Sequence, residues 1–302
     1  MIVVHVRSLE LDDVDAVVRL VLDALATDAA HNPLIEPDVD AHTLAASLRA
    51  TRESCLVGVE GGVVRGHLYG VVLAGGAGDE AWTGPDGWSG ASAVATLLRA
   101  AARERWYASG VRAHHVWVRD DADALAPWLA DGYRVEDVRG LRALDDTAAG
   151  RDDLDGLILR RGRDVDVALR FDELIDAANG ESPVRGRARR ERRRFLADLL
   201  EDPETTQYLL ERDGNVLAQC IAFAVEPTRS TPLRTLHLSA VAVEPAARRH
   251  GLARALVRAV LADGASTFTH AQVTWRPANA AASHLWRALG FRSTYARLVR
   301  SL

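Results

Sequence analysis

The chain has 302 residues, of which 48% are hydrophobic, and carries a formal net charge of −5. This length suits two domains of about 150 residues each, and no apolar run approaches the roughly 18 residues that a membrane span needs. The acidic balance argues against general affinity for nucleic acids or anionic membranes. The N-terminus resembles a strand rather than a signal peptide, and two cysteines suit a reducing compartment, so we expect a cytoplasmic protein.

The first half predicts a strand, two helices, a hairpin, a helix, a strand, a helix and a final strand. The helices show apolar residues at helical spacing, and the strands are short apolar runs between glycine-containing turns. A glycine-rich and polar segment precedes the third helix and predicts a loop or a degraded strand. In chain order the predicted elements are 2–7, 12–25, 41–50, 55–59 with 63–73, the loop 74–90, 91–109, 114–118, 122–130 and a closing strand.

The second half repeats this order, after an acidic segment of small residues without periodicity that predicts a linker. The hairpin turn Asp213-Gly-Asn215 carries the glycine and asparagine of a tight connection. The predicted elements are 157–160, 165–178, 188–200, 207–212 with 216–225, 236–243, a helix beginning at 252, 270–275, a helix after Asn279 and 291–298.

The run Val243-Glu-Pro-Ala-Ala-Arg248-Arg-His-Gly251-Leu-Ala253 joins a predicted strand to a predicted helix. A strand that turns into a helix start leaves several backbone N–H groups unpaired, and the helix dipole adds positive charge there. Gly251 allows close approach of a ligand, and Arg248 and Arg249 supply charge-assisted contacts. The spacing V-x-P-x-x-R-x-x-G-x-A therefore favours a pyrophosphate site over an ordinary strand-to-helix connection.

This run resembles the acetyl-CoA pyrophosphate loop of the GCN5-related N-acetyltransferase (GNAT) family, (Q/R)-x-x-G-x-(G/A). A second family motif follows at Asn279-Ala-Ala-Ala-Ser-His-Leu-Trp286-Arg-Ala-Leu-Gly290-Phe291. The family usually has tyrosine where this chain has Trp286. The resemblance covers roughly residues 157–302 and implies an α/β fold of the α+β type, with a mixed, largely antiparallel, twisted sheet flanked by helices.

An internal repeat extends the resemblance to the first half. A shift of 158 residues places the segment from Asp121 to Arg134 on the segment from Asn279 to Arg292, with Trp128 falling on Trp286. Gly90-Ala-Ser-Ala93-Val-Ala95 takes the place of the loop, without its arginine or central glycine. We therefore expect two tandem GNAT folds: a degenerate domain at 1–145, a linker at 146–156 and an acetyl-CoA-binding domain at 157–302.

The resemblance implies acetyl-CoA as co-substrate, with its pantetheine arm lying between two strands that splay apart. It implies no metal, and the scattered histidines form no metal-binding spacing. The residues expected to bind acetyl-CoA are Val241, Val243, Arg248, Arg249, His250, Gly251, Leu252, Ala253, Arg254, Asn279 and Trp286.

Acetyl transfer to an amine requires a base, and His237, eleven residues before Arg248, lies where family members often carry one. Its ordinary pKa near neutrality suits this role, and Ser239 points to the same side of the strand. A structural histidine is the alternative. Because Trp286 is not an acid, Tyr295, water or the acceptor's own ammonium must supply the proton for the thiolate.

Seven arginines between Arg185 and Arg194 form the densest charge run. A solvated helix face, attraction of an acidic acceptor or of the anionic cofactor, and a nucleic-acid patch are three interpretations. The last is weakened because no aromatic residue interrupts the run.

Together these features predict an acetyl-CoA-dependent N-acetyltransferase that acts on a primary amine of a small molecule or peptide by direct attack in a ternary complex. We expect a monomer in which the two halves form an internal pseudo-dimer. A non-catalytic acyl-CoA sensor is the alternative, suggested by the missing tyrosine. The tandem layout also resembles mycothiol synthases, which acetylate a cysteinyl amine, although no motif singles them out.

Overall fold

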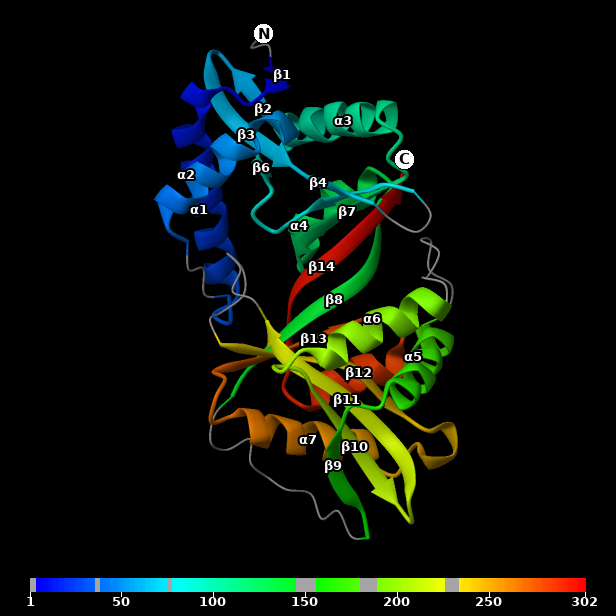
Figure 1. Ribbon diagram of the computed structural model, residues 1–302. Coiled ribbons are helices and arrows are strands. Elements are labelled where there is room, and N and C mark those ends of the chain that lie inside the picture. The colour runs from blue at the N-terminus through cyan, green and yellow to red at the C-terminus, as the bar shows by residue number, and fades with distance from the viewer. Residues whose placement is uncertain (1–3, 36–38, 75–77, 145–155, 180–188, 226–233) are drawn as a thin grey trace.

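The computed structural model describes residues 4–35, 39–74, 78–144, 156–179, 189–225 and 234–302. Figure 1 shows two bodies, one from each half of the chain, joined by two long strands, β8 (Arg134–Ala143) and β14 (Arg292–Ser301). The predicted linker at 146–156 lies outside the described residues except for Gly156.

The first half follows the predicted order, with helices α2 and α4 at the predicted bounds. Asp40 fixes the start of α2, because its side chain accepts a hydrogen bond from the backbone N–H of Thr43. The segment predicted as a loop or degraded strand instead contains the short strands β5 and β6. The elements are β1 (Val4–Ser8), α1 (Val14–His31), α2 (Ala41–Ala50), β2 (Cys55–Glu60), β3 (Val63–Tyr69), β4 (Val71–Leu73), β5 (Glu80–Thr83), β6 (Trp88–Gly90), α3 (Ser92–Ala108), β7 (Ala113–Arg119), α4 (Ala122–Ala130) and β8.

The second half also has the predicted order, and strand β13 has the predicted bounds. Helix α7 presents apolar residues at helical spacing to the sheet and buries Leu252, Leu256 and Val260 among others. The elements are β9 (Ile158–Gly162), α5 (Val165–Asn179), α6 (Arg189–Glu201), β10 (Thr206–Arg212), β11 (Asn215–Val225), β12 (Thr235–Val243), α7 (Leu252–Gly264), β13 (His270–Trp275), α8 (Ala280–Ala288) and β14.

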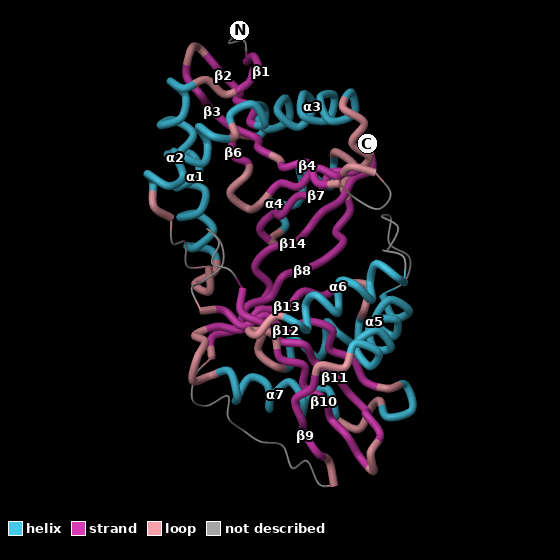
Figure 2. The backbone as a smooth tube through the Cα atoms, viewed as in Figure 1, coloured by secondary structure: helices cyan, strands magenta, loops and turns pink. Residues whose placement is uncertain are grey.

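Among the described residues the strands form two sheets. A four-stranded sheet has the order β1-β2-β3-β6, and a ten-stranded sheet has the order β4-β5-β7-β14-β8-β13-β12-β11-β10-β9. Pairing is antiparallel except for β5 with β7 and β12 with β13. Figure 2 shows the strands of the large sheet passing from one body to the other. The mixed, largely antiparallel sheet flanked by helices confirms the predicted fold class.

The last strand of each half is exchanged into the other half. Strand β14 pairs with β7 of the first half, and β8 pairs with β13 of the second half. The two exchanged strands also pair with each other at the centre of the sheet. Each body therefore depends on a strand from the other for a continuous sheet, which the predicted domain boundaries at 145 and 157 do not capture.

The internal repeat is visible in the geometry of α4 and α8. Asp121 and Asn279, 158 residues apart, each cap a helix by accepting hydrogen bonds from backbone N–H groups three residues later, at 3.0 and 3.1 Å. Trp128 packs edge-on against Tyr133, with ring centroids 5.0 Å apart, and Trp286 packs in the same way against Phe291 at 5.4 Å.

Four hydrophobic clusters of described residues stabilise the two bodies. The first half holds a cluster under α1 and α2 and another under α3 and α4, while the second half holds one under α7 and α8 and a small one under α5 and α6. Leu298 and Ala296 of the exchanged strand β14 belong to the cluster under α3. The core of the first half is therefore completed by the C-terminal strand.

Candidate functional site

The connection between β12 and α7 forms an open turn at the N-terminus of α7. Arg249 and Gly251 adopt left-handed φ angles of 68° and 77°, and Gly251 is the N-cap. No described side chain caps this helix end, so the first N–H groups of α7 remain available to a ligand. A methyl group at Gly251 would meet nothing within 4 Å, so the glycine is needed for its backbone conformation and not for space. The turn has the charge and geometry of an anion site.

Strands β12 and β13 separate next to this turn. They pair in parallel from Thr235 with His270 to Leu238 with Val273. Ala240 then adopts a φ of 47° at a bulge in the pairing with β11. In the part of the chain that the structure describes, the β13-facing edge of β12 has no strand partner after Leu238. The predicted splay is confirmed, and the pairing of a pantetheine arm with Val241 and Val243 stays a prediction.

A cavity of about 950 Å³ opens along this splay. Its lining comes from β12, the turn and α8, and from α5 and α6. Twelve of the predicted site residues line it: His237, Ser239, Val241, Val243, Arg248, Arg249, Gly251, Leu252, Ala253, Arg254, Asn279 and Trp286. His250 instead lines a second cavity of about 1250 Å³ on the outer side of the turn.

His237 lies in the wall formed by β12. Its ring centroid is 5.0 Å from that of Phe223, and its Nδ1 is 3.2 Å from the side-chain nitrogen of Gln272. Burial, assisted by the positive charge of Arg139, lowers the pKa of His237 to about 4, so its imidazole is neutral at pH 7.

The side chain of Gln272 can determine which ring nitrogen of His237 carries the proton. Its buried Oε1 has no hydrogen-bond partner among the described residues. If the amide turns by 180°, this oxygen accepts a hydrogen bond from Nδ1–H of His237. Nε2 then keeps a free lone pair and can accept a proton.

Asn279 and Trp286 combine structural roles with positions in the cavity wall. Asn279 caps α8, and its side-chain nitrogen donates to Oδ1 of Asn179 at 3.2 Å, which ties α8 to α5. Trp286 is 5% exposed and belongs to the core under α7 and α8. Its ring is therefore a fixed part of the wall rather than a mobile group.

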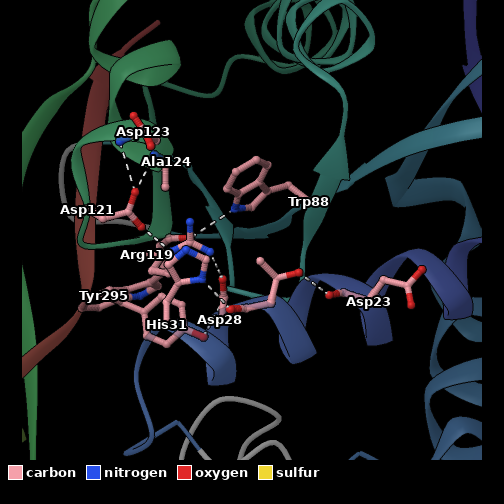
Figure 3. A network of polar contacts seen from close by, with 11 residues as sticks. Asp23, Asp28, His31, Trp88, Arg119, Asp121, Asp123, Ala124 and Tyr295 are labelled. Atoms are coloured by element: carbon pink, nitrogen blue, oxygen red, sulfur yellow. Dashed lines mark hydrogen bonds and ion pairs between the residues drawn. The ribbon is translucent and has the colours of Figure 1, made fainter.

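Tyr295 does not line this cavity, and the prediction that it protonates the leaving thiolate is wrong. Strand exchange carries β14 into the first half, where the Tyr295 hydroxyl donates to Asp28 of α1 at 2.9 Å (Figure 3). Arg119 donates to the same carboxylate at 2.9 Å. Burial and the charge of Asp28 raise the pKa of Tyr295, which makes it a weaker acid than an ordinary tyrosine.

The arginine run begins, within the described residues, at Arg189 of α6, because residues 185–188 lie outside them. Its guanidinium groups pair mainly with carboxylates of the neighbouring α5. The pairs are Arg189 with Glu173 at 2.6 Å, Arg192 with Asp172 at 3.6 Å and with Asp176, and Arg193 with Asp166. For the described arginines that form these pairs, this favours the interpretation of an exposed helix face.

Asp137 is a lining residue that sequence reasoning missed. It is contributed by β8 of the first half, which exchange brings beside β13. Its carboxylate contacts Arg297 of β14, and its Oδ1 lies 3.9 Å from Nε of Arg276, which also lines the cavity. The local sequence of β8 shows an ordinary strand and does not reveal its partner.

Two further observations concern metal sites and membrane-spanning helices. Among the described residues, no group of three or more histidine, cysteine or carboxylate side chains could hold a metal ion. No helix in the described ranges is both long and apolar enough to cross a membrane.

Comparison with protein-family models matches residues 171–291 to the acetyltransferase (GNAT) family. Residues 171–291 form a GNAT domain. The family consists of acetyltransferases that use acetyl-CoA, and the matched segment contains the turn, the splay and most of the cavity wall.

Solved structures share the fold of the whole chain. A GCN5-related N-acetyltransferase from Sphaerobacter thermophilus is similar with a TM-score of 0.63 and 14% identity, over 99% of this chain and 95% of that one. A tandem GNAT protein from the clavulanic acid biosynthesis pathway, solved without AcCoA, has a TM-score of 0.56 and 17% identity, over 99% and 98%. A glucosamine N-acetyltransferase region of a fungal GH3 β-N-acetylglucosaminidase has a TM-score of 0.57 and 14% identity, over 99% of this chain and 38% of that one. A search of curated proteins gives no match. These identities show a shared fold alone.

The first half lacks the turn that marks the GNAT domain. In the second half, residues 244–251 connect β12 to α7, whereas Ala91 alone connects β6 to α3. The indole N–H of Trp88 on β6 donates to the carbonyl of Trp117 on β7 at 3.3 Å. This contact bridges the two strands at the position that corresponds to the splay between β12 and β13.

Proposed function

We propose that this chain transfers an acetyl group from acetyl-CoA to a primary amine by direct attack in a ternary complex. The observation that carries the proposal is the uncapped N-terminus of α7, which adjoins a splayed strand pair and a cavity of about 950 Å³. The match of residues 171–291 to the GNAT family supports the same reaction class.

The residues of the turn fit the pyrophosphate of acetyl-CoA. Backbone N–H groups at the start of α7 would bind the phosphate oxygens, and Arg249 and Arg254 would add positive charge. Arg248 holds the turn itself, because its Nε donates to the carbonyl of Val243 at 3.1 Å. The unpaired edge of β12 at Val241 and Val243 would bind the amide groups of the pantetheine arm.

His237 is the proposed base. The acceptor nitrogen forms a bond to the acetyl carbon as the carbon–sulfur bond breaks, and the nitrogen must lose a proton. His237 would take this proton directly or through water, since its imidazole is neutral at pH 7. The CoA thiolate would then be protonated by water or by the acceptor's own ammonium proton, because Tyr295 lies elsewhere.

The proposal is tested by incubating the purified protein with acetyl-CoA labelled in the acetyl group and a panel of primary amines. The expected result is transfer of label to at least one amine, with release of free CoA thiol in equal amount. The panel should include a cysteinyl amine, because of the resemblance to mycothiol synthases. Absence of labelled product with every amine, while acetyl-CoA still binds, would contradict acetyl transfer.

A non-catalytic acyl-CoA sensor is the second candidate, favoured by Trp286 in place of the family's usual tyrosine. A sensor would bind acetyl-CoA without consuming it, and ligand binding would alter the protein rather than an amine. The same assay separates the two functions, because only a transferase releases CoA in an amine-dependent manner.

A further inference from the structure

The wall of the cavity that faces α5 and α6 is mainly apolar. It is formed by Leu174, Ile175, Ala178, Phe195, Leu196 and Leu199. Phe195 is 49% exposed, a high value for a phenyl side chain. The same cavity is lined by β12 and α8, where the pantetheine arm is expected, so this apolar surface is available to the acceptor.

The charged side chains of α5 and α6 pair mainly with each other. The arginines of α6 pair with the carboxylates of α5, as described above, and Arg192 is shared between Asp172 and Asp176. Burial raises the pKa of the Asp172 carboxyl, although Arg192 lowers it, and this side chain lines the cavity beside the apolar wall. A carboxylate at this wall disfavours a second anion next to it.

Asp137 provides a further carboxylate that lines the same cavity. It is contributed by β8, and Arg139, two residues later on that strand, pairs in register with Thr274 on β13. Thr274, Asp137 and His237 all line the cavity. Arg297 of β14 and Arg276, whose Nε lies 3.9 Å from Oδ1, both flank the Asp137 carboxylate, so it is fixed in place.

We infer that the acceptor is a primary amine with an apolar body, whose ammonium group binds Asp137 and whose hydrocarbon part packs on α5 and α6. This inference rests on the proposed function. Because Asp137 belongs to the first half, the acceptor site is shared by both halves, and the degenerate half takes part in substrate recognition. Asp137 is a specificity-determining residue here, and proton removal remains with His237.

The test compares 2-phenylethylamine with ethanolamine, which lacks an apolar body, and with glutamate, which is acidic. We expect 2-phenylethylamine to have the highest kcat/KM of the three. Asp137→Asn should raise its KM about tenfold or more, in line with loss of a charged hydrogen bond, and leave the Kd for acetyl-CoA unchanged. Phe195→Ala should raise the KM for 2-phenylethylamine severalfold and leave that for ethanolamine unchanged.

Glu136→Gln is the matched control, because Glu136 contacts the same Arg297 at 3.2 Å but does not line the cavity. Both substitutions remove a charged partner of Arg297, so both should lower the melting temperature. Only Asp137→Asn should raise the KM for the amine. If both variants raise KM equally, or if glutamate is the preferred acceptor, the inference is overturned.

Failure of the proposed function can be distinguished from failure of this inference. If no amine is acetylated, calorimetric binding of 2-phenylethylamine to the CoA-loaded protein still reports on the site. Binding that is lost in Asp137→Asn supports the inference, and binding that is equal in the two proteins contradicts it.

Discussion

At the scale of single residues, the open turn at residues 244–251 could be predicted from the sequence, whereas Asp137 and the position of Tyr295 could not. A turn is a local feature, since Gly251 and the arginines before it are close in the chain and act through backbone geometry. The surroundings of Asp137 and Tyr295 depend on which strands pair, and this depends on contacts between residues more than a hundred positions apart.

The first prediction concerns the pH dependence of His237. Its lowered pKa of about 4 keeps the imidazole neutral, and so able to accept a proton, as pH falls from 7 towards 4. The acid limb of kcat should therefore lie well below the ordinary histidine range. His237→Ala should lower kcat about 10²-fold, a typical general-base contribution.

Gln272→Glu supplies the matched test. A carboxylate beside Nδ1 favours the charged imidazolium, so the pKa of His237 should rise and the acid limb should move to higher pH. The measurement is kcat against pH for the wild type and both variants. An acid limb that stays in place in Gln272→Glu, with kcat unaffected by His237→Ala, would show that this histidine is structural.

The second prediction concerns Tyr295. Tyr295→Phe removes its hydrogen bond to the half-buried Asp28, whose pKa is already raised by burial, and should lower the free energy of unfolding by about 1–3 kcal/mol. The kcat should change less than twofold, since Tyr295 does not line the cavity. Denaturant unfolding and steady-state kinetics on the same variant check both parts, and a tenfold loss of kcat with unchanged stability would restore Tyr295 as a proton donor.

At the scale of elements, the order and most bounds of the helices and strands followed from periodicity and turn residues. The exchange of β8 and β14 did not, for an identifiable reason. The two strands have the same length and the same alternation of buried and exposed positions along their residues. The local sequence pattern therefore cannot decide whether each strand stays in its own half. Strands β5 and β6 are short and lie in a glycine-rich segment, so the local pattern did not identify them either.

The third prediction follows from this exchange. Residues 1–145 and 156–302, expressed separately, should fail to form soluble monomers, because each body would lack its exchanged central strand and expose unpaired backbone groups. Expressed together, they should copurify as a one-to-one complex. Two soluble, independently folded halves with cooperative unfolding transitions would show that the exchange is not required.

At the scale of the whole molecule, β8 and β14 pair with each other within one chain. In a dimer of single domains, the equivalent strands of two copies could form such a pair. We therefore expect a monomer with an internal pseudo-dimer, and sedimentation at micromolar concentration should give the mass of one chain, 32.7 kDa. A tight dimer under those conditions would contradict this expectation.

The two halves should differ in cofactor binding. Only the GNAT domain retains the turn of residues 244–251, and Trp88 bridges the corresponding strands in the first half. We therefore expect one acetyl-CoA site in each chain, and we expect the first half to supply Asp137 to the acceptor site instead of a second cofactor site.

Calorimetric titration of the full chain with acetyl-CoA tests this central claim most directly. We expect one site per chain, and loss of binding in Arg249→Glu, because that variant places a negative charge in the turn proposed to bind the pyrophosphate. Arg103→Glu, on α3 of the first half, is the matched control and should leave the titration unchanged. Two equivalent sites, or wild-type affinity in Arg249→Glu, would contradict it.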